Sequence, residues 1–433
     1  MDIKKSRREI LQMSGLGILG LAGCMEGSNE AKCPDGAIEK ENEYQPIKGS
    51  GGWWPHPGCN LTGDGKGYGM DPKSDTMEIS WEVPFPMASM PSVRPLIRDD
   101  TAYVGWQRMG GLGMLYSLDV ERGEEKWVAE YEGGALVPGS VTRDQIYAGS
   151  PDGFHSFDVE TGGLSMSFKP EGEWRFINGV HGGDRLYVVG MGAGEEDTIY
   201  GIDPETGEIE WEFRSDYIAG LFAIQGDSVY ITGKDKIHRL LRVDGSEVWS
   251  VSAGPGYIND QVIANGEIIY GIGRSEYTGE HKISAIEDSC GSIDWSVVSG
   301  ENGTFGGMAA SENALYVSSQ VKISGRNEAT ARMIALDQSG GSRLWTSEAE
   351  NMKYATTEWG NPIMINGQIY VGELQDRINR SDIASMKIID GITGELIRTI
   401  QLYEASIFLG PSSVSAGKDT IYSLIGGTLR AIR

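Results

Sequence analysis

The sequence predicts an all-β protein, an eight-bladed β-propeller of four-stranded antiparallel blades. Glycine is abundant, at 62 of 433 residues, and its scattered positions indicate many tight turns. Short alternating strands centred on tyrosine recur 40 to 54 residues apart, at Tyr103, Tyr147, Tyr187, Tyr230, Tyr270, Tyr316, Tyr370 and Tyr422. This spacing is typical of propeller blades, each of which buries its faces against its neighbours.

The first 23 residues are predicted to be an export signal. Arg7 and Arg8 precede an apolar run that is too short to span a bilayer, and residues 6–12 resemble a twin-arginine signal. Residues 21–24 resemble a lipobox, so we expect Cys24 to carry a lipid, the alternative being a signal end with an incidental cysteine. A double acyl chain anchors a protein stably. The expected location is therefore the outer face of the cytoplasmic membrane.

Two short segments are expected between this signal and the propeller. Residues 24–50 are polar, have little apolar periodicity and predict a flexible tether. Residues 51–76 contain Trp53 and Trp54 and are interpreted as a lead-in that caps one face, in preference to a ligand site. The propeller is expected to span residues 77–433.

Cysteines and glycosylation sequences add weaker expectations. Cys33 and Cys59 are candidates for a disulfide in an oxidising exterior, which would leave Cys290 unpaired. Three sequences fit the pattern for N-glycosylation, at Asn60, Asn302 and Asn379.

Each repeat contains a turn that is closed by glycine and followed by tryptophan four residues later. An aspartate caps the turn amides, the glycine supplies a positive φ, and the tryptophan covers the next blade with one N–H that needs a partner. The intact copies are Asp119, Gly123 and Trp127; Asp203, Gly207 and Trp211; Gly245 and Trp249; Gly291 and Trp295; and Asp337, Gly341 and Trp345. Degenerate copies place Met166 or Arg398 at the tryptophan position, and the copy with Gly245 and Trp249 has Leu241 where aspartate is expected.

Closure of the ring is predicted from its two ends. Only one strand fits after Tyr422, and residues 77–83 form a strand that contains Trp81 but follows no tyrosine strand. The N-terminal strand is therefore expected to complete the last blade, which removes an exposed edge. Seven blades is the alternative if one degenerate copy is an insertion.

The motif Ala-x-Asp-x-x-x-Gly-x-x-x-Trp resembles the tryptophan-docking motif of the pyrroloquinoline-quinone (PQQ)-like repeat family, over about four-fifths of the chain. The lipid signal, the size and the repeats are also similar to those of BamB-type lipoprotein propellers. The resemblance implies either a non-catalytic protein-interaction scaffold or a PQQ- and Ca²⁺-dependent dehydrogenase that oxidises an alcohol or sugar. Such enzymes typically stack the cofactor on a disulfide of adjacent cysteines, which this sequence lacks. We therefore expect a scaffold with no cofactor, metal or catalytic residue, in which the motif residues are structural.

Charge narrows the expected partners. The formal net charge of −25 repels nucleic-acid phosphates and anionic lipid heads, so the expected partner is an unidentified envelope or surface protein. The acidic residues are spread along the chain and are interpreted as a solvated shell of the halophilic kind, in preference to a cation site. The run of Glu195, Glu196 and Asp197 is likewise interpreted as a solvated turn.

Overall fold

The computed structural model describes residues 71–72, 76–85, 94–108, 110–172, 174–192, 196–218, 222–252, 254, 257–300, 303–323, 329–349, 355–377, 382–405, 413–425 and 427–433. They belong to one compact unit, Gly36–Arg433, and the other unit, Met1–Asp35, lies outside them. Every helix or strand in this described part is a β-strand, which confirms the all-β prediction.

Four sheets consist of four antiparallel strands each, and their strand bounds follow in spatial order. The first contains β2 (Leu96–Arg98), β3 (Thr101–Gln107), β4 (Gly113–Asp119) and β5 (Glu125–Tyr131). The second contains β14 (Phe222–Gln225), β15 (Ser228–Thr232), β16 (Lys236–Leu241) and β17 (Glu247–Ser252). The third contains β18 (Tyr257–Asn265), β19 (Ile268–Ser275), β20 (His281–Glu287) and β21 (Ile293–Val298). The fourth contains β31 (Ser413–Gly417), β32 (Thr420–Ile425), β33 (Thr428–Ile432) and β1 (Ile79–Pro84).

The remaining strands form two larger sheets. The eight-stranded sheet contains β6 (Val137–Val141), β7 (Gln145–Ser150), β8 (Gly153–Asp158), β9 (Leu164–Phe168), β10 (Trp174–His181), β11 (Leu186–Gly192), β12 (Asp197–Ile202) and β13 (Ile209–Ser215). The nine-stranded sheet contains β22 (Gly303–Ala310), β23 (Ala314–Lys322), β24 (Ala329–Asp337), β25 (Arg343–Glu348), β26 (Ala355–Trp359), β27 (Ile363–Ile365), β28 (Gln368–Arg377), β29 (Asp382–Asp390) and β30 (Leu396–Ala405). Each consists of two antiparallel runs joined at one residue pair, Ile177 with Ser150 and Ala329 with Thr356. We call each antiparallel run in the six sheets a blade.

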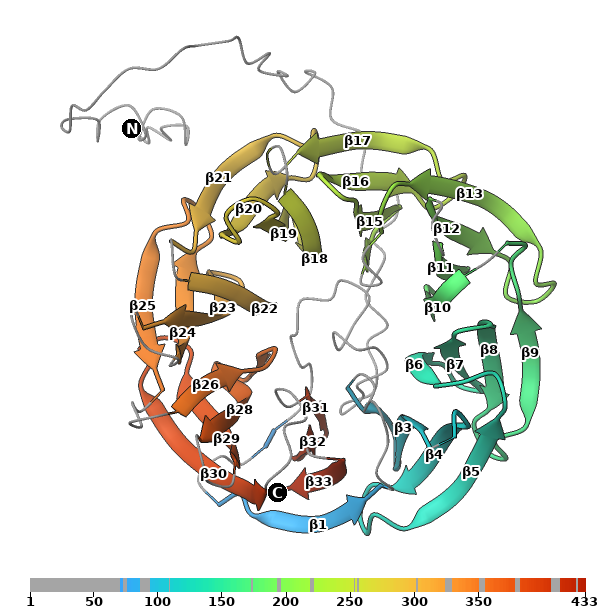
Figure 1. The fold of residues 1–433 in the computed structure, drawn as a ribbon, viewed down its shortest axis with the longest axis horizontal. Helices are drawn as coiled ribbons and strands as arrows, with labels where there is room; N and C mark the ends of the chain where they lie inside the picture. Colours follow the sequence, from blue (N-terminus) through green and yellow to red (C-terminus); the bar gives the residue numbers. More distant parts are fainter. Residues whose placement is uncertain are drawn as a thin grey trace, which may run out of the picture. The chain divides into compact units, whose positions relative to one another are not determined.

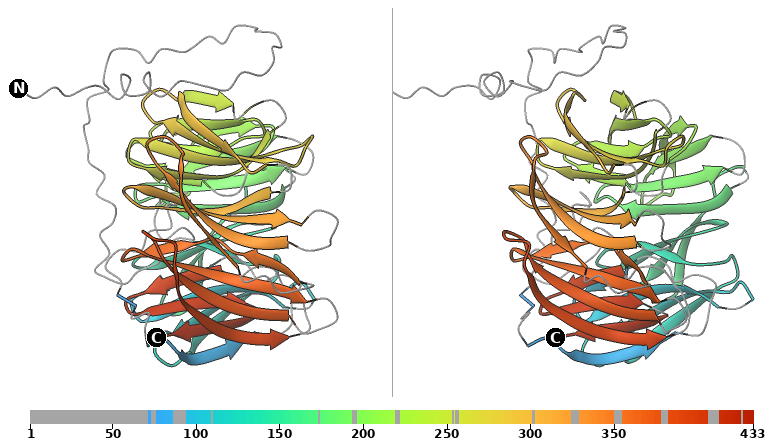
Figure 2. Two further views of the ribbon diagram at one scale, coloured as in Figure 1. Left: turned by 90° about the vertical axis from the view of Figure 1, so that its left-hand side faces the viewer. Right: turned by 60° about the vertical axis from the view of Figure 1, so that its left-hand side comes forward.

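The blades surround a common axis, as Figure 1 shows, and Figure 2 shows the same unit from the side. The outermost strands form the rim, and they are β1, β5, β9, β13, β17, β21, β25 and β30. The N-terminal strand β1 pairs with the C-terminal strand β33, in register from Trp81 opposite Ala431 to Pro84 opposite Thr428. The ends of the described ring therefore lie in one sheet, which is the closure that the sequence predicts.

The core lies between neighbouring blades. One cluster joins Tyr103 and Leu115 of the first blade to Ile146 and Phe157 of the next. Successive side chains of a strand point to opposite faces of the sheet. Nearly every residue of an inner strand such as β3 is buried, so both faces of a blade pack on a neighbour. The fold therefore depends on contacts between blades, and the repeat motif is positioned at these contacts.

Candidate functional site

The turn before an outer strand is built around a glycine and a capping carboxylate. In the first blade the Gly123 amide donates to the Asp119 carbonyl at 2.8 Å, and the Asp119 carboxylate accepts from the amides of Glu121 and Arg122 at 2.9 and 3.0 Å. A φ between 67° and 75°, which strains any residue with a Cβ, is shared by Gly123, Gly162, Gly207, Gly245, Gly291, Gly341 and Gly394. Leu241 replaces the capping aspartate in one turn, and the backbone bond from Gly245 is still made, at 2.9 Å.

The tryptophans of the motif reach from one blade to the turn of the next. Each indole Nε1 donates to a turn carbonyl: Trp81 to Val120 at 2.9 Å, Trp127 to Val159 at 2.9 Å, Trp211 to Arg242 at 2.9 Å, Trp249 to Asp288 at 2.7 Å, Trp295 to Gln338 at 2.8 Å and Trp345 to Gly391 at 3.2 Å. Each ring also lies on the turn glycine, so that a Cβ added to Gly245 would come within 2.5 Å of the Trp211 ring. The hydrogen bond and the close approach together fix the spacing of adjacent blades.

The same indoles pack on the tyrosines of their own blades. The ring centroids lie 6.0 Å apart for Trp81 and Tyr422, 6.0 Å for Trp127 and Tyr103, 5.9 Å for Trp211 and Tyr187, 6.2 Å for Trp249 and Tyr230, 5.9 Å for Trp295 and Tyr270, and 6.0 Å for Trp345 and Tyr316. In the closing blade the tryptophan comes from the N-terminal strand and the tyrosine from a C-terminal one. The indole faces are thus engaged in packing.

One turn lacks its indole. Met166 of β9 lies opposite Ser156 of β8, the register that Trp127 of β5 has opposite Ser117 of β4. Within the described residues no atom lies within 4 Å of a Cβ added to Gly207, whereas each of the other turn glycines meets a tryptophan ring. The degenerate copy in β9 therefore leaves Gly207 without a ring over it among the described side chains.

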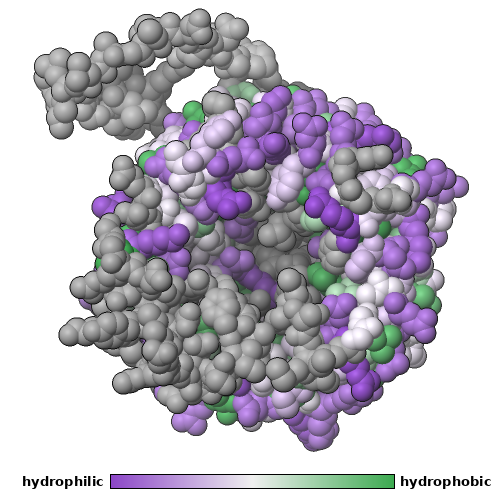
Figure 3. Space-filling view, in the orientation of Figure 1, coloured by the Kyte–Doolittle hydropathy of each residue, from purple (hydrophilic) through white to green (hydrophobic). Residues whose placement is uncertain are grey.

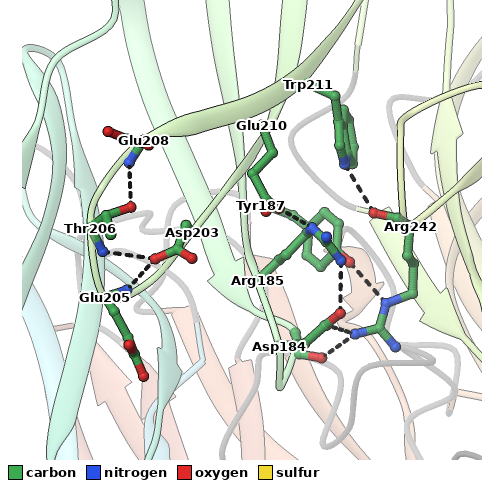
Figure 4. Close-up of polar contacts among 11 residues, drawn as sticks. Asp184, Arg185, Tyr187, Asp203, Glu205, Thr206, Glu208, Glu210, Trp211 and Arg242 are labelled. Atoms are coloured by element: carbon green, nitrogen blue, oxygen red, sulfur yellow. Dashed lines mark hydrogen bonds and ion pairs between the residues drawn. The ribbon is translucent and has the colours of Figure 1, made fainter.

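Arg242 forms a second connection beside Trp211. Its guanidinium donates to the Tyr187 hydroxyl and the Gly182 carbonyl, both at 2.8 Å, and pairs with Asp184. Figure 4 shows the guanidinium pointing toward Tyr187 and Asp184, while the Trp211 indole points toward the Arg242 backbone. Burial raises the pKa of Tyr187 to about 12, so its hydroxyl stays protonated at neutral pH.

Asp288 occupies the equivalent turn position in the following blade. The Tyr230 hydroxyl donates to its carboxylate at 2.7 Å, and the Arg239 guanidinium donates to its carbonyl at 2.8 Å. Burial raises the pKa of the Asp288 carboxyl above its ordinary value, although the hydrogen bond from Tyr230 and the charge of Arg239 oppose this. Neither this contact nor that of Arg242 was predicted, because the side chain after the turn's first residue varies between repeats. Arg242 and Asp288 share only their position, directly after the first residue of the turn.

A buried ion pair lies within the nine-stranded sheet. The Glu373 carboxylate accepts hydrogen bonds from Trp359 Nε1 at 3.0 Å and from Ser385 Oγ at 2.6 Å, and Lys387 Nζ lies 3.2 Å from it. Lys387 also donates to Thr399 at 3.1 Å. Glu373 is 1% exposed and Lys387 6%. The alternation of apolar and polar residues along these strands did not reveal the pair, because charged residues in such a pattern usually face solvent.

A histidine, two serines and an aspartate meet near the turn between β7 and β8. The fully buried His155 has Nε2 3.0 Å from Ser150 Oγ and Nδ1 3.0 Å from Ser167 Oγ, and Ser150 Oγ donates to Asp152 at 2.7 Å. In a hydrolytic triad the carboxylate orients the histidine and the serine faces substrate. Here Ser150 is buried and bonded to the carboxylate itself. The group is therefore a packed polar network, in which burial lowers the pKa of His155 to about 4.

A calcium–quinone centre would need a cluster of metal-ligating side chains. No group of three or more His, Cys, Asp or Glu side chains in this part of the chain is placed to hold a metal ion, and Ca²⁺ requires several converging oxygen ligands. Four of the buried cations, Arg239, Arg242, Lys387 and Arg430, pair with protein carboxylates.

Asp197 corrects one interpretation of the sequence. Its side chain is buried, and its carboxylate accepts from the amides of Gly192 and Ile218 at 2.8 and 2.7 Å. Glu196 is exposed, and Glu195 lies outside the described residues. Asp197 therefore does not belong to a solvated turn, because it joins two backbone segments in the interior.

The residues expected to direct export, lipidation and glycosylation all lie outside the described part of the chain. They are Arg7, Arg8, Cys24, Asn60, Asn302 and Asn379. Cys290 is disulfide-bonded, which corrects the expectation that it is unpaired. Cys33 and Cys59 also lie outside the described residues. The chain has four cysteines, so the Cys290 bond is compatible with a Cys33–Cys59 bridge or with a lipid on Cys24, but not with both. The sequence could not reveal the Cys290 bond, because spacing along the chain does not show which thiols meet.

Hydrophilic residues cover most of the described surface on the face in Figure 3, and hydrophobic residues are scattered near its edge. Several of the exposed aliphatic side chains belong to outer strands, such as Leu164 of β9 and Leu344 of β25. The part of the chain that the structure describes contains no helix of the length and apolar character needed to cross a membrane.

Known proteins give a match at the level of family and fold. The family described as outer membrane protein assembly factor BamB matches residues 195–413, and no curated protein matches the sequence. BamB from Moraxella catarrhalis is 16% identical, with a TM-score of 0.58 over 83% of this chain and 100% of that one. Quinohemoprotein alcohol dehydrogenase from Comamonas testosteroni is 11% identical, with a TM-score of 0.66 over 88% and 80%. A europium-containing methanol dehydrogenase is 12% identical, with a TM-score of 0.61 over 86% and 89%. At these identities the solved structures indicate a shared β-propeller fold.

Proposed function

We propose, from the premise that this chain belongs to the family described as outer membrane protein assembly factor BamB, that it is a non-catalytic protein-interaction scaffold at the cell envelope. The observation that carries the proposal is how the motif residues are used. Trp211 donates its one N–H to Arg242 and lies against Gly245 and Tyr187. The tryptophan, glycine and tyrosine that characterise the repeat thus hold neighbouring blades together.

The proposed architecture has eight blades. The four four-stranded sheets count as one blade each, and the two larger sheets count as two each, because a single residue pair joins their halves. In the second half of the nine-stranded sheet, β26 and β27 both pair with β28 and together replace one inner strand. Such a ring presents loops at both ends of its axis, which suits binding of another protein.

The proposed setting is extracellular, with the propeller held at the outer face of the cytoplasmic membrane by lipid on Cys24. The sequence signals in residues 1–24 support export and anchoring. The net charge of −25 favours a solvated acidic shell suited to high salt and disfavours nucleic acid as a partner. A Cys24→Ser chain should be released from the membrane fraction of the producing cells, while the wild-type chain stays with it. Equal retention of both chains would contradict the anchor.

Cross-linking tests the scaffold directly. A photo-reactive amino acid placed at exposed positions of the full-length anchored chain should capture one dominant protein, and the same positions in a heat-unfolded sample should not. A chain that captures no specific partner under these conditions would count against a scaffold.

Reconstitution tests the alternative, a quinoprotein dehydrogenase. We expect addition of PQQ and Ca²⁺ to the purified chain to give neither stoichiometric binding nor dye-linked oxidation of alcohols or sugars. Tight binding with turnover would overturn the scaffold proposal, whatever partner the cross-linking recovers.

A further inference from the structure

We propose that the turn at 203–207 binds a tryptophan side chain of a partner protein, presented on an extended segment that pairs with the edge of β9. The proposal rests on the proposed scaffold function and adds a location and a chemistry to it. Among the described side chains none covers Gly207, whereas each of the other turn glycines lies beneath an indole ring of the preceding blade.

The chain itself shows which side chain fits this position. In the neighbouring blade Trp211 lies over Gly245 and donates to the Arg242 carbonyl at 2.9 Å. The equivalent carbonyl beside Gly207 belongs to Pro204, and in the described part of the structure no residue donates a hydrogen bond to it. An indole placed over Gly207 would find the same glycine surface and the same acceptor. Burial of an aromatic ring together with its N–H bond favours binding.

The edge beside this turn is the one least protected against strand pairing. The strand β9 reads Leu-Ser-Met-Ser-Phe and contains no charged residue. At least one Asp, Glu, Lys or Arg lies in each of the other outer strands, β1, β5, β13, β17, β21, β25 and β30. Charges on edge strands oppose pairing with other chains. The uncharged edge and the uncovered turn therefore coincide at one blade.

The surrounding charge indicates what should flank the tryptophan. Glu160, Glu205 and Glu208 are exposed on the turns next to β9 and β13. The nearby cations are already paired with carboxylates: Arg185 with Glu210 and Asp184, Lys169 with Asp152, and Arg214 with Glu212. The surface around the position is thus acidic, and the complementary segment has lysine or arginine beside its tryptophan. The inferred occupant is an extended basic segment of a protein with one central tryptophan.

Binding of a designed peptide tests this inference. The probe is a fluorescein-labelled heptapeptide copied from β5 (Glu125–Tyr131), with lysine in place of its two glutamates. We expect saturable binding to the full chain by fluorescence anisotropy. Replacing the peptide tryptophan with alanine should weaken binding at least tenfold, because the indole supplies the main contact.

Two variants of the protein locate the site. Met166→Trp should fill the position from within and weaken peptide binding at least tenfold, while its melting temperature stays equal to or above that of the wild type. Leu164→Lys should weaken binding severalfold by adding a charge to the edge. Leu344→Lys is the matched control on β25, since the two leucines are 53% and 52% exposed, and it should leave binding unchanged. Absence of binding, unchanged binding in Met166→Trp, or equal losses in both lysine variants would overturn the inference.

The outcomes separate this inference from the proposed function. If Met166→Trp still cross-links the dominant partner in cells, the site is wrong and the scaffold stands. If the wild-type chain captures no partner, or shows PQQ-dependent turnover, the scaffold itself fails.

Discussion

The Nε1 atom of Trp211 lies 2.9 Å from the carbonyl oxygen of Arg242 in the next blade. The guanidinium of the same arginine returns to the blade of Trp211, where it meets the hydroxyl of Tyr187 at 2.8 Å. Two residues therefore connect neighbouring blades in both directions, and the Tyr187 ring lies against the Trp211 indole. This arrangement allows each connection to be removed separately.

Trp211→Phe should destabilise the propeller. Phenylalanine keeps an aromatic ring over Gly245 but leaves the Arg242 carbonyl without its donor, so we expect a loss of about 1–2 kcal/mol in the free energy of unfolding. Trp211→Ala also removes the packing and should cost about 3–5 kcal/mol. Urea unfolding followed by circular dichroism measures both. Met166→Leu, at the same register in a blade without an indole, serves as control and should change stability by less than about 1.5 kcal/mol.

Arg242→Lys should also be destabilising, although it conserves the charge. Lysine cannot supply the planar set of donors that reaches Tyr187 and Gly182 together, so we expect a loss of about 1.5–3 kcal/mol. The control is Arg214→Lys, because Arg214 forms an exposed pair with Glu212 and such pairs contribute about 0–1 kcal/mol. Equal unfolding midpoints for the two variants would show that the Arg242 contacts do not contribute to stability.

The sequence was sufficient for the repeat because the motif is local. Asp119, Gly123 and Trp127 lie within nine residues of one another, and their spacing alone predicts a capped turn and a large ring beyond it. Closure could be predicted as well. The last blade lacks a strand and the N-terminal strand lacks a blade, so each could be completed only by the other. Both predictions follow from the chain's own periodicity.

The contacts between blades were not predictable in the same way. Arg242 and Tyr187 are 55 residues apart, and nothing in the repeat requires an arginine after the first residue of the turn. Glu373 and Lys387 form a buried ion pair. The alternation of apolar and polar residues along a strand does not distinguish such buried charges from charges that face solvent. The uncovered Gly207 could be suspected from Met166 in the sequence, but whether another side chain fills the space is a property of the packing.

Stability should fall as the pH drops from about 6.5 to about 4, through His155. Burial lowers the pKa of His155 from 6.5 to about 4 in the folded protein. In that interval the unfolded chain binds a proton that the folded chain does not, so the free energy of unfolding decreases, by about 3 kcal/mol over the whole interval. Above about pH 6.5 the histidine is neutral in both states and its effect is constant.

A difference measurement isolates this histidine from the many carboxylates. The free energy of unfolding of the wild type minus that of His155→Gln should decrease as the pH falls from 6.5 to 4 and should be flat above 7. Parallel pH profiles for the two proteins would contradict the assignment. Asp152 acts in a lower window, because hydrogen bonds from Lys169, Ser150 and Tyr131 outweigh its burial and lower its pKa to about 2. Its contribution is lost only as the pH falls from about 4 to about 2.

Lys387→Met should be more damaging than removal of the whole Glu373–Lys387 pair. The single change leaves the Glu373 carboxylate buried without its counter-charge, although Ser385 and Trp359 still donate to it. We expect a loss of about 3–5 kcal/mol. In the double variant Glu373→Gln with Lys387→Met no charge remains buried, the amide keeps acceptor and donor groups for its neighbours, and much of that loss should be recovered. Guanidinium unfolding of the wild type, both single variants and the double variant gives the coupling energy. Additive losses would show that the two side chains act independently of each other in the folded protein.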